Sequence, residues 1–137
     1  MPIGTEPMTT ELKLLAWSVV LGFVHIVLAS HAASFQHGYD WTASSRDHPM
    51  PPLPGVGGRL ERASRNFLET FPFFAAAVLI AHAAGRESWL TWWGANLYFW
   101  GRIAFLPLYA FGVFLIRSLV WNVSAIGILL ILAALIF

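Results

Sequence analysis

Residues 62–84 read RASRNFLETFPFFAAAVLIAHAA, so three strongly polar side chains run directly into an apolar stretch that can enter a membrane. Counted from Arg62, Asn66 follows four residues later and Glu69 seven later. At 3.6 residues per turn, these three side chains share one face of a helix. Ionisable groups near a bilayer are costly to desolvate and are kept mainly where they face partners or a ligand. The segment therefore predicts a binding site for a small zwitterion at the end of a membrane helix.

The composition is typical of a polytopic membrane protein. Of the 137 residues, 58% are hydrophobic and 11% are charged, and the mean hydropathy is +0.66. These values lie far from the averages of soluble proteins, and the length allows one domain. A formal net charge of +1 argues against a nucleic-acid partner. Because the chain has no cysteine, disulfides, thiolate metal sites and a cysteine nucleophile are excluded.

Four apolar segments predict an all-α, integral membrane four-helix bundle that occupies residues 1–137 as a single domain. Each segment is close to the roughly 20 residues that a bilayer requires. The first is longer than the apolar region of a signal peptide, so we interpret it as a retained helix. The expected helices cover about 11–34, 59–84, 89–110 and 114–137. Prolines and glycines within the polar loop 36–58 prevent one continuous helix there.

The distribution of basic residues predicts the orientation of the bundle. With four helices, both termini lie on one side, and the 36–58 loop and the 111–113 turn lie on the other. Lys13 and Arg86 fall toward the first side. Six arginines fall in or toward the second: Arg46, Arg59, Arg62, Arg65, Arg102 and Arg117. The positive-inside tendency makes the arginine-rich side cytoplasmic, in the inner or cell membrane if the protein is bacterial.

A second group of candidate residues comprises Arg102, Tyr109, Arg117 and Ser118. Arg102 interrupts the apolar sequence of the third helix, and Arg117 lies near the start of the fourth. Both project toward the same membrane side as the first group, so the two groups can converge on one site. A structural alternative stays open, in which the arginines reach lipid headgroups and Tyr109 belongs to an aromatic belt. In the same alternative, Arg65 pairs with Glu69 one turn later.

The histidines give weaker signals. His25, His31 and His37 recur every six residues, which places neighbours on opposite sides of a helix and forms no metal-binding face. We therefore predict no metal site. A bis-histidine haem held by His25 and His82 is a third and less favoured interpretation.

The motif Arg59-x-x-Arg62-Ala63-x-x-Asn66-x-x-Glu69, followed by Phe71-Pro72-Phe73, resembles a known family signature. It is similar to that of the membrane-associated proteins in eicosanoid and glutathione metabolism, the MAPEG family, and most of all to microsomal glutathione transferases. The later Arg102-(six residues)-Tyr109 and Arg117-Ser118 match the same family's pattern. Trp121 is a departure, because several members carry a tyrosine there.

The resemblance implies a homotrimer in a membrane, with glutathione held between neighbouring subunits near the cytoplasmic side. It implies that glutathione contacts Arg62, Asn66 and Glu69, with Arg65, Arg102 and Tyr109 beside it. Arg117 would hold the thiol as a thiolate and Ser118 would supply the adjacent hydroxyl. A guanidinium near a thiol lowers the pKa of the thiol and raises the population of the nucleophile.

Two functions follow as hypotheses. The first is a glutathione-dependent transferase or peroxidase that acts on lipophilic electrophiles entering from the bilayer. The alternative is a non-catalytic membrane subunit of a larger complex, or a scaffold that binds a lipid, quinone or pigment. The same arginines would then clamp phospholipids.

Overall fold

The computed structural model describes residues 6–137, and these residues form five helices. The helices are α1 (Thr10–His37), α2 (Tyr39–Ala43), α3 (Gly55–Ala83), α4 (Trp89–Ala110) and α5 (Ile116–Ile136). No strand occurs between residues 6 and 137. The prediction of an all-α protein is therefore confirmed.

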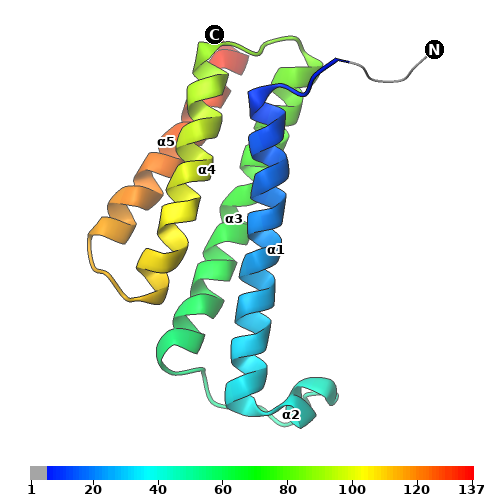
Figure 1. The fold of residues 1–137 in the computed structure, drawn as a ribbon, viewed down its shortest axis with the longest axis vertical. Coiled ribbons are helices and arrows are strands. Elements are labelled where there is room, and N and C mark those ends of the chain that lie inside the picture. Colours follow the sequence, from blue (N-terminus) through cyan, green and yellow to red (C-terminus); the bar gives the residue numbers. More distant parts are fainter. Residues whose placement is uncertain (1–5) are drawn as a thin grey trace, which may run out of the picture.

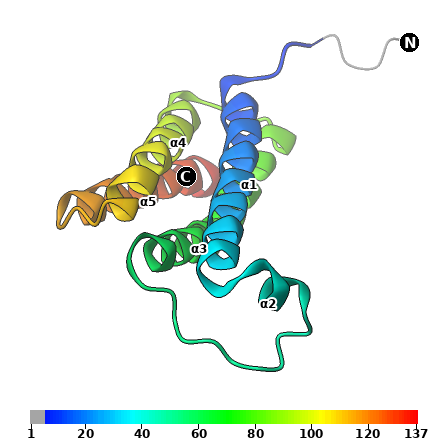
Figure 2. The same ribbon diagram turned by 60° about the horizontal axis from the view of Figure 1, so that its bottom comes forward.

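The four long helices lie side by side (Figure 1), with α4 packed on α5 and α1 packed on α3. The start of α1 and the end of α5 are at one end of the molecule, which we call the termini end. The opposite end, the loop end, holds α2, residues 44–54 and the turn between α4 and α5. Figure 2 shows residues 44–54 leaving α2 in a wide loop before the chain enters α3.

Local sequence explains where the elements begin and end. The side chain of Thr9 accepts a hydrogen bond from the Leu12 N–H at 3.3 Å and caps α1. Gly38, with φ of 95°, ends α1, and one further helical turn, α2, forms inside the loop predicted for 36–58. Helix α3 begins at Gly55, four residues before the expected start at Arg59, directly after the last proline of the loop.

Three described helices, α1, α3 and α5, are long and apolar enough to cross a membrane. This agrees with a membrane protein, and the three helices correspond to three of the four segments expected to span the bilayer. Helix α4 has the length of a span, at 22 residues, but carries polar residues such as Thr91 and Arg102. Both of these side chains are buried inside the molecule, so they face the other helices.

Aromatic and small side chains hold the bundle together. The ring of Tyr98 in α4 stacks on Phe74 in α3, with 4.0 Å between ring centres. The Tyr98 hydroxyl lies 3.2 Å from the hydroxyl of Thr70. Helices α4 and α5 touch backbone to backbone, because Gly94 and Gly127 face each other without side chains. This close contact fixes how residues at the start of α5 face α4.

Arg59 fastens the loop end. Its Nε donates a hydrogen bond to the carbonyl oxygen of Ala110 at 2.8 Å, and its side chain lies against Gly112. The arginine thus joins the start of α3 to the end of α4. Its guanidinium binds the protein's own backbone, where the sequence had suggested a lipid headgroup.

Candidate functional site

A cavity of about 260 Å³ opens between α3, α4 and α5 near the loop end, and we call it the α4–α5 cavity. Asn66 reaches it from α3, and Tyr109 from α4. Arg117 and Ser118 reach it from the first turn of α5. Four residues that the sequence singled out on three separate helices are therefore brought together.

A turn with an unusual backbone conformation comes directly before α5, whose first turn lines this cavity. Leu115, just before the helix, has φ of 63°, a conformation that residues other than glycine rarely adopt. The guanidinium of Arg117 then lies 4.9 Å from the centre of the Tyr109 ring. This contact holds the cation over an aromatic face and leaves its N–H groups available to a ligand.

Arg102 does not line the cavity but contacts two residues that do, Asn66 and Phe105. It is 0% exposed, and its Nη1 donates a hydrogen bond to Asn66 Oδ1 at 2.9 Å. Its guanidinium lies 4.6 Å from the ring centre of Phe105 and 5.3 Å from that of Phe67. Nε and Nη2 are buried and have no hydrogen-bond partner among the described residues.

The charge of the site is therefore positive. Arg117 lines the cavity and Arg102 lies directly behind it, while none of the side chains that line it within residues 6–137 is acidic. Buried charges are normally paired, and a buried guanidinium with unused donors favours an anionic partner. The start of α5 adds the positive end of a helix dipole. The arrangement suits a ligand with a carboxylate or thiolate.

The remaining predicted residues of α3 lie outside this cavity. Arg62 and Glu69 are exposed, and neither lines the α4–α5 cavity. Arg65 is also exposed and pairs with Glu61, with 3.2 Å between Nη2 and Oε1. The partner of Arg65 is thus one turn earlier in α3, and the alternative pairing with Glu69 is wrong. Within one chain, only Asn66 of the helix motif enters the cavity.

Three further side chains line the cavity: Phe105, Trp121 and Asn122. Phe105 comes four residues before Tyr109, a spacing that places both on one face of α4 and that sequence reasoning could have used. Trp121 was noted only as a departure from the family pattern. Its Nε1 is buried and has no hydrogen-bond partner among the described residues.

The two histidines considered for a haem lie too far apart to share one. His25 is buried and stacks on Phe67, with 4.9 Å between ring centres. Phe67 and His82 are 15 residues apart in α3, which is about 22 Å at 1.5 Å per residue. His82 instead lies beside Glu87 at the termini end, with 3.2 Å between Nδ1 and Oε1. In the described part of the chain, no three side chains of the types His, Cys, Asp and Glu gather as a metal site.

No curated protein and no solved structure matches the chain. The family comparison does give a match, and its extent is decisive. The model of the MAPEG family matches residues 14–137, which is nearly the whole chain and includes every residue of the α4–α5 cavity. The protein belongs to the MAPEG family.

Proposed function

We propose that the protein is a glutathione-dependent membrane transferase or peroxidase that acts on lipophilic electrophiles. One observation carries the proposal: Asn66, Tyr109 and Arg117 meet in a cavity whose only charged lining group in the described chain is a guanidinium, with the buried Arg102 behind it. Membership of the MAPEG family, which includes glutathione transferases, supports the same function.

Glutathione supplies the nucleophilic sulfur, which a chain without cysteine lacks. Arg117 stabilises the thiolate because its charge is permanent and because it lies in the first turn of α5, where the helix dipole also favours an anion. The Ser118 hydroxyl donates a hydrogen bond to the same sulfur. Asn66, held by Arg102, binds an amide or carboxylate of the tripeptide.

The exposed residues of α3 extend the site beyond one chain. Arg62 and Glu69 are exposed outside the α4–α5 cavity and can meet the rest of the tripeptide or a neighbouring copy, and Arg65, which is exposed and paired with Glu61, lies beside them. We infer a homotrimer in which a neighbouring subunit closes the site on the cytoplasmic side of the membrane.

Replacement of Arg117 tests this function. A thiol with a pKa near 8.5 is only a few per cent ionised at neutral pH, and lowering that pKa by two units corresponds to about 2.7 kcal/mol. Arg117→Leu should therefore cut turnover with a reactive aryl halide or a lipid hydroperoxide by roughly one to two orders of magnitude. Arg117→Lys should retain part of the activity, because it keeps the charge but loses the planar fork.

The matched control is Arg86→Leu, which removes an exposed arginine at the termini end. This variant should keep wild-type turnover and the wild-type ultraviolet thiolate absorbance on addition of glutathione. If the wild-type protein shows neither turnover nor thiolate absorbance, the non-catalytic scaffold replaces the enzyme as the explanation of the site.

A further inference from the structure

The α4–α5 cavity lies between two separate parts of the bundle. Asn66 belongs to α3, whereas Tyr109 and Arg117 belong to the hairpin that α4 and α5 form (Figure 1). The contact between Gly94 and Gly127 fixes α4 to α5, but it does not fix this hairpin to α3. A ligand that bonds to both walls of the cavity therefore depends on another contact that sets their distance.

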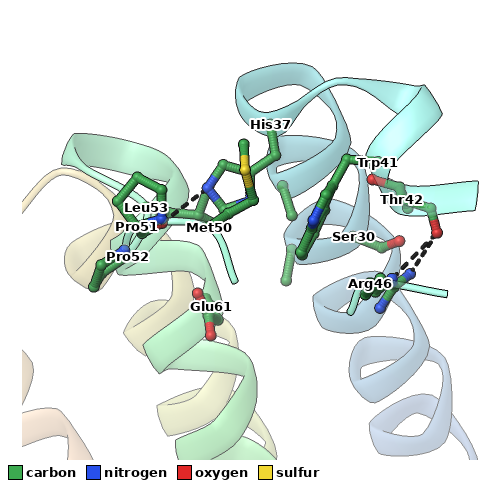
Figure 3. A pocket seen from close by; sticks show the side chains of 12 residues that line it. Ser30, His37, Trp41, Thr42, Arg46, Met50, Pro51, Pro52, Leu53 and Glu61 are labelled. Carbon is green, nitrogen blue, oxygen red and sulfur yellow. Dashed lines mark hydrogen bonds between the residues drawn. The ribbon is translucent and has the colours of Figure 1, made fainter. Parts of the chain in front are cut away.

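The side of α3 that faces α1 is open near its start. A cavity of about 410 Å³ lies between the end of α1, α2, residues 46–53 and the first turns of α3 (Figure 3). Its charged lining residues include Arg46, on the side of α1, and Glu61, which projects from α3. Glu61 comes two residues after Arg59, or about 200° around a helix, so Arg59 lies on the other side of α3. Arg59 can thus hold the start of α3 from the side opposite this cavity.

The end of α4 offers a backbone carbonyl to Arg59. Three carbonyl oxygens in the last turn accept hydrogen bonds from backbone N–H groups: Pro107 from Phe111, Leu108 from Val113, and Tyr109 from Gly112. The last two bonds, with φ of 69° at Gly112, form a Schellman cap. The carbonyl oxygen of Ala110, the last residue of α4, instead accepts from Arg59 Nε at 2.8 Å. A cation is favoured at this end of a helix, so Arg59 completes the cap of α4 from another helix.

Arg59 and Asn66 tie α3 to α4 at two points. They are seven residues apart, so they share one face of α3 and lie about 10 Å from each other along the helix. Asn66 accepts a hydrogen bond from Arg102 in α4 at 2.9 Å. The partner of Arg59, Ala110, directly follows Tyr109, whose ring lies 4.9 Å from the Arg117 guanidinium. The bond of Arg59 therefore bears on the position of the whole hairpin wall.

We propose that Arg59 is a positioning residue that sets the width of the α4–α5 cavity, so that Asn66 and Arg117 bind one glutathione molecule together. Arg59 does not line the cavity and acts through the Ala110 carbonyl. This role rests on the proposed glutathione-dependent function. Without Arg59, each wall keeps its own polar groups, but the distance between the walls is no longer fixed.

The kinetics of Arg59→Ala test this role. The KM for glutathione should rise roughly fivefold to tenfold, the loss expected when one hydrogen bond across the cavity is no longer made. At saturating glutathione, kcat should stay within about twofold of wild type, because Arg117 and the start of α5 remain beside the sulfur. A residue that only stabilises the fold would lower the melting temperature and leave KM unchanged.

A double variant shows whether Arg59 acts through the opposite wall. In Asn66→Ala, α3 no longer contributes its amide to the ligand, so the width of the cavity has less effect on binding. The added change Arg59→Ala should then alter KM by no more than about twofold. Two increases that multiply in the double variant would show that Arg59 and Asn66 act independently, and they would overturn the proposal.

Two further variants serve as controls. Arg59→Lys keeps a cation that can donate to the Ala110 carbonyl, and its KM should lie between those of wild type and Arg59→Ala. The matched control is Arg86→Ala, since Arg86 Nη1 also donates to a backbone carbonyl of a distant helix, that of Ala134 at 3.5 Å, at the termini end. Arg86→Ala should keep the wild-type KM. Circular dichroism should show wild-type helix content in all of these variants.

Hydrogen–deuterium exchange tests the contact itself without glutathione. In Arg59→Ala, the amides of Gly112 and Val113 should exchange roughly tenfold faster, because the end of α4 loses its attachment to α3. The amides of Gly85 and Arg86 close the end of α3 with the same pair of bonds and should exchange as in wild type. Unchanged exchange at Gly112 and Val113, or an unchanged KM, would overturn the proposal. Wild-type protein that does not bind glutathione would instead contradict the proposed function, and the exchange rates would still decide whether Arg59 holds the hairpin.

Discussion

Arg102 places a positive charge inside the molecule without a carboxylate beside it. It contacts the Asn66 amide and the rings of Phe67 and Phe105. Two of its buried nitrogens have no partner in the described chain. Such an arrangement contributes little to stability, because the cost of desolvating the charge is not offset by an ion pair. We interpret Arg102 as the residue that orients Asn66 and attracts an anionic ligand.

Replacing Arg102 by leucine should therefore weaken glutathione binding while changing the stability of the fold little. An apolar residue of similar reach removes the desolvated charge, so the melting temperature of Arg102→Leu in detergent should stay within a few degrees of wild type. The affinity for glutathione, measured by calorimetry, should fall by roughly 1.5–3 kcal/mol, the range for a hydrogen bond to a charged group.

Asn66→Ala is the matched comparison, since it removes the other partner of the same hydrogen bond. It should lose a similar amount of binding energy, and the double variant should lose less than the sum of the two. A large drop in melting temperature with unchanged affinity would assign Arg102 to the fold alone.

Helices α4 and α5 form the most closely packed pair, and two glycines make that possible. A Cβ at Gly127 would lie 2.5 Å from the carbonyl oxygen of Gly94 and 2.8 Å from the backbone nitrogen of Tyr98. Both atoms belong to the backbone and cannot turn aside. Arg117 lies about three turns from Gly127 along α5, and Tyr109 about four turns from Gly94 along α4, both toward the loop end. The spacing of these helices therefore also affects the distance between Arg117 and Tyr109.

Gly127→Ala should force α4 and α5 apart. The expected loss of stability is about 1–3 kcal/mol, as for overpacking in a dense interior. Chemical denaturation in mixed micelles measures it, and glutathione affinity should fall in the same variant. Leu129→Ala alters an exposed side chain on the same helix and should change neither quantity. Wild-type stability in Gly127→Ala would mean that the two backbones are not in contact.

The whole molecule separates its termini from its loops. Helix α1 begins and α5 ends at the termini end (Figure 1), while Arg46 of the 36–58 loop, Arg59 at the start of α3 and both described cavities with charged groups lie toward the loop end. A bundle of this kind has a single orientation once it is inserted, and the concentration of arginine at the loop end favours the cytoplasm for that end.

Cysteine labelling in intact cells tests the orientation. The chain has no cysteine, so Ser45→Cys and Phe137→Cys can be labelled without background. A membrane-impermeant maleimide should modify the cysteine at position 137 in intact cells and the one at position 45 only after lysis. Labelling of both from the same side would contradict the four-span topology, in which α4 also crosses the membrane.

Several features could be predicted from the sequence because they depend on local composition. Apolar runs of sufficient length predicted the four long helices, and the prolines at 49–54 predicted the break between the first two long helices, α1 and α3. The short helix α2 was missed because a single turn has no hydrophobic period of its own. The spacing of Arg62, Asn66 and Glu69 predicted that the three side chains share one face of a helix. It did not determine whether that face is buried in the bundle or exposed on its surface.

Sequence alone determined the class of the protein, the number of long helices and the residue types that recur in the MAPEG family, because hydropathy and motif spacing are properties of consecutive residues. Tertiary structure decided which polar groups meet. Arg59 donates a hydrogen bond to the Ala110 carbonyl, and Arg65 pairs with Glu61. Arg102 is buried beside Asn66, whereas Arg62 and Glu69 are exposed. These outcomes depend on how helices from distant segments rotate against one another, and that rotation is set by the packing of Gly94 on Gly127 and of Tyr98 on Phe74.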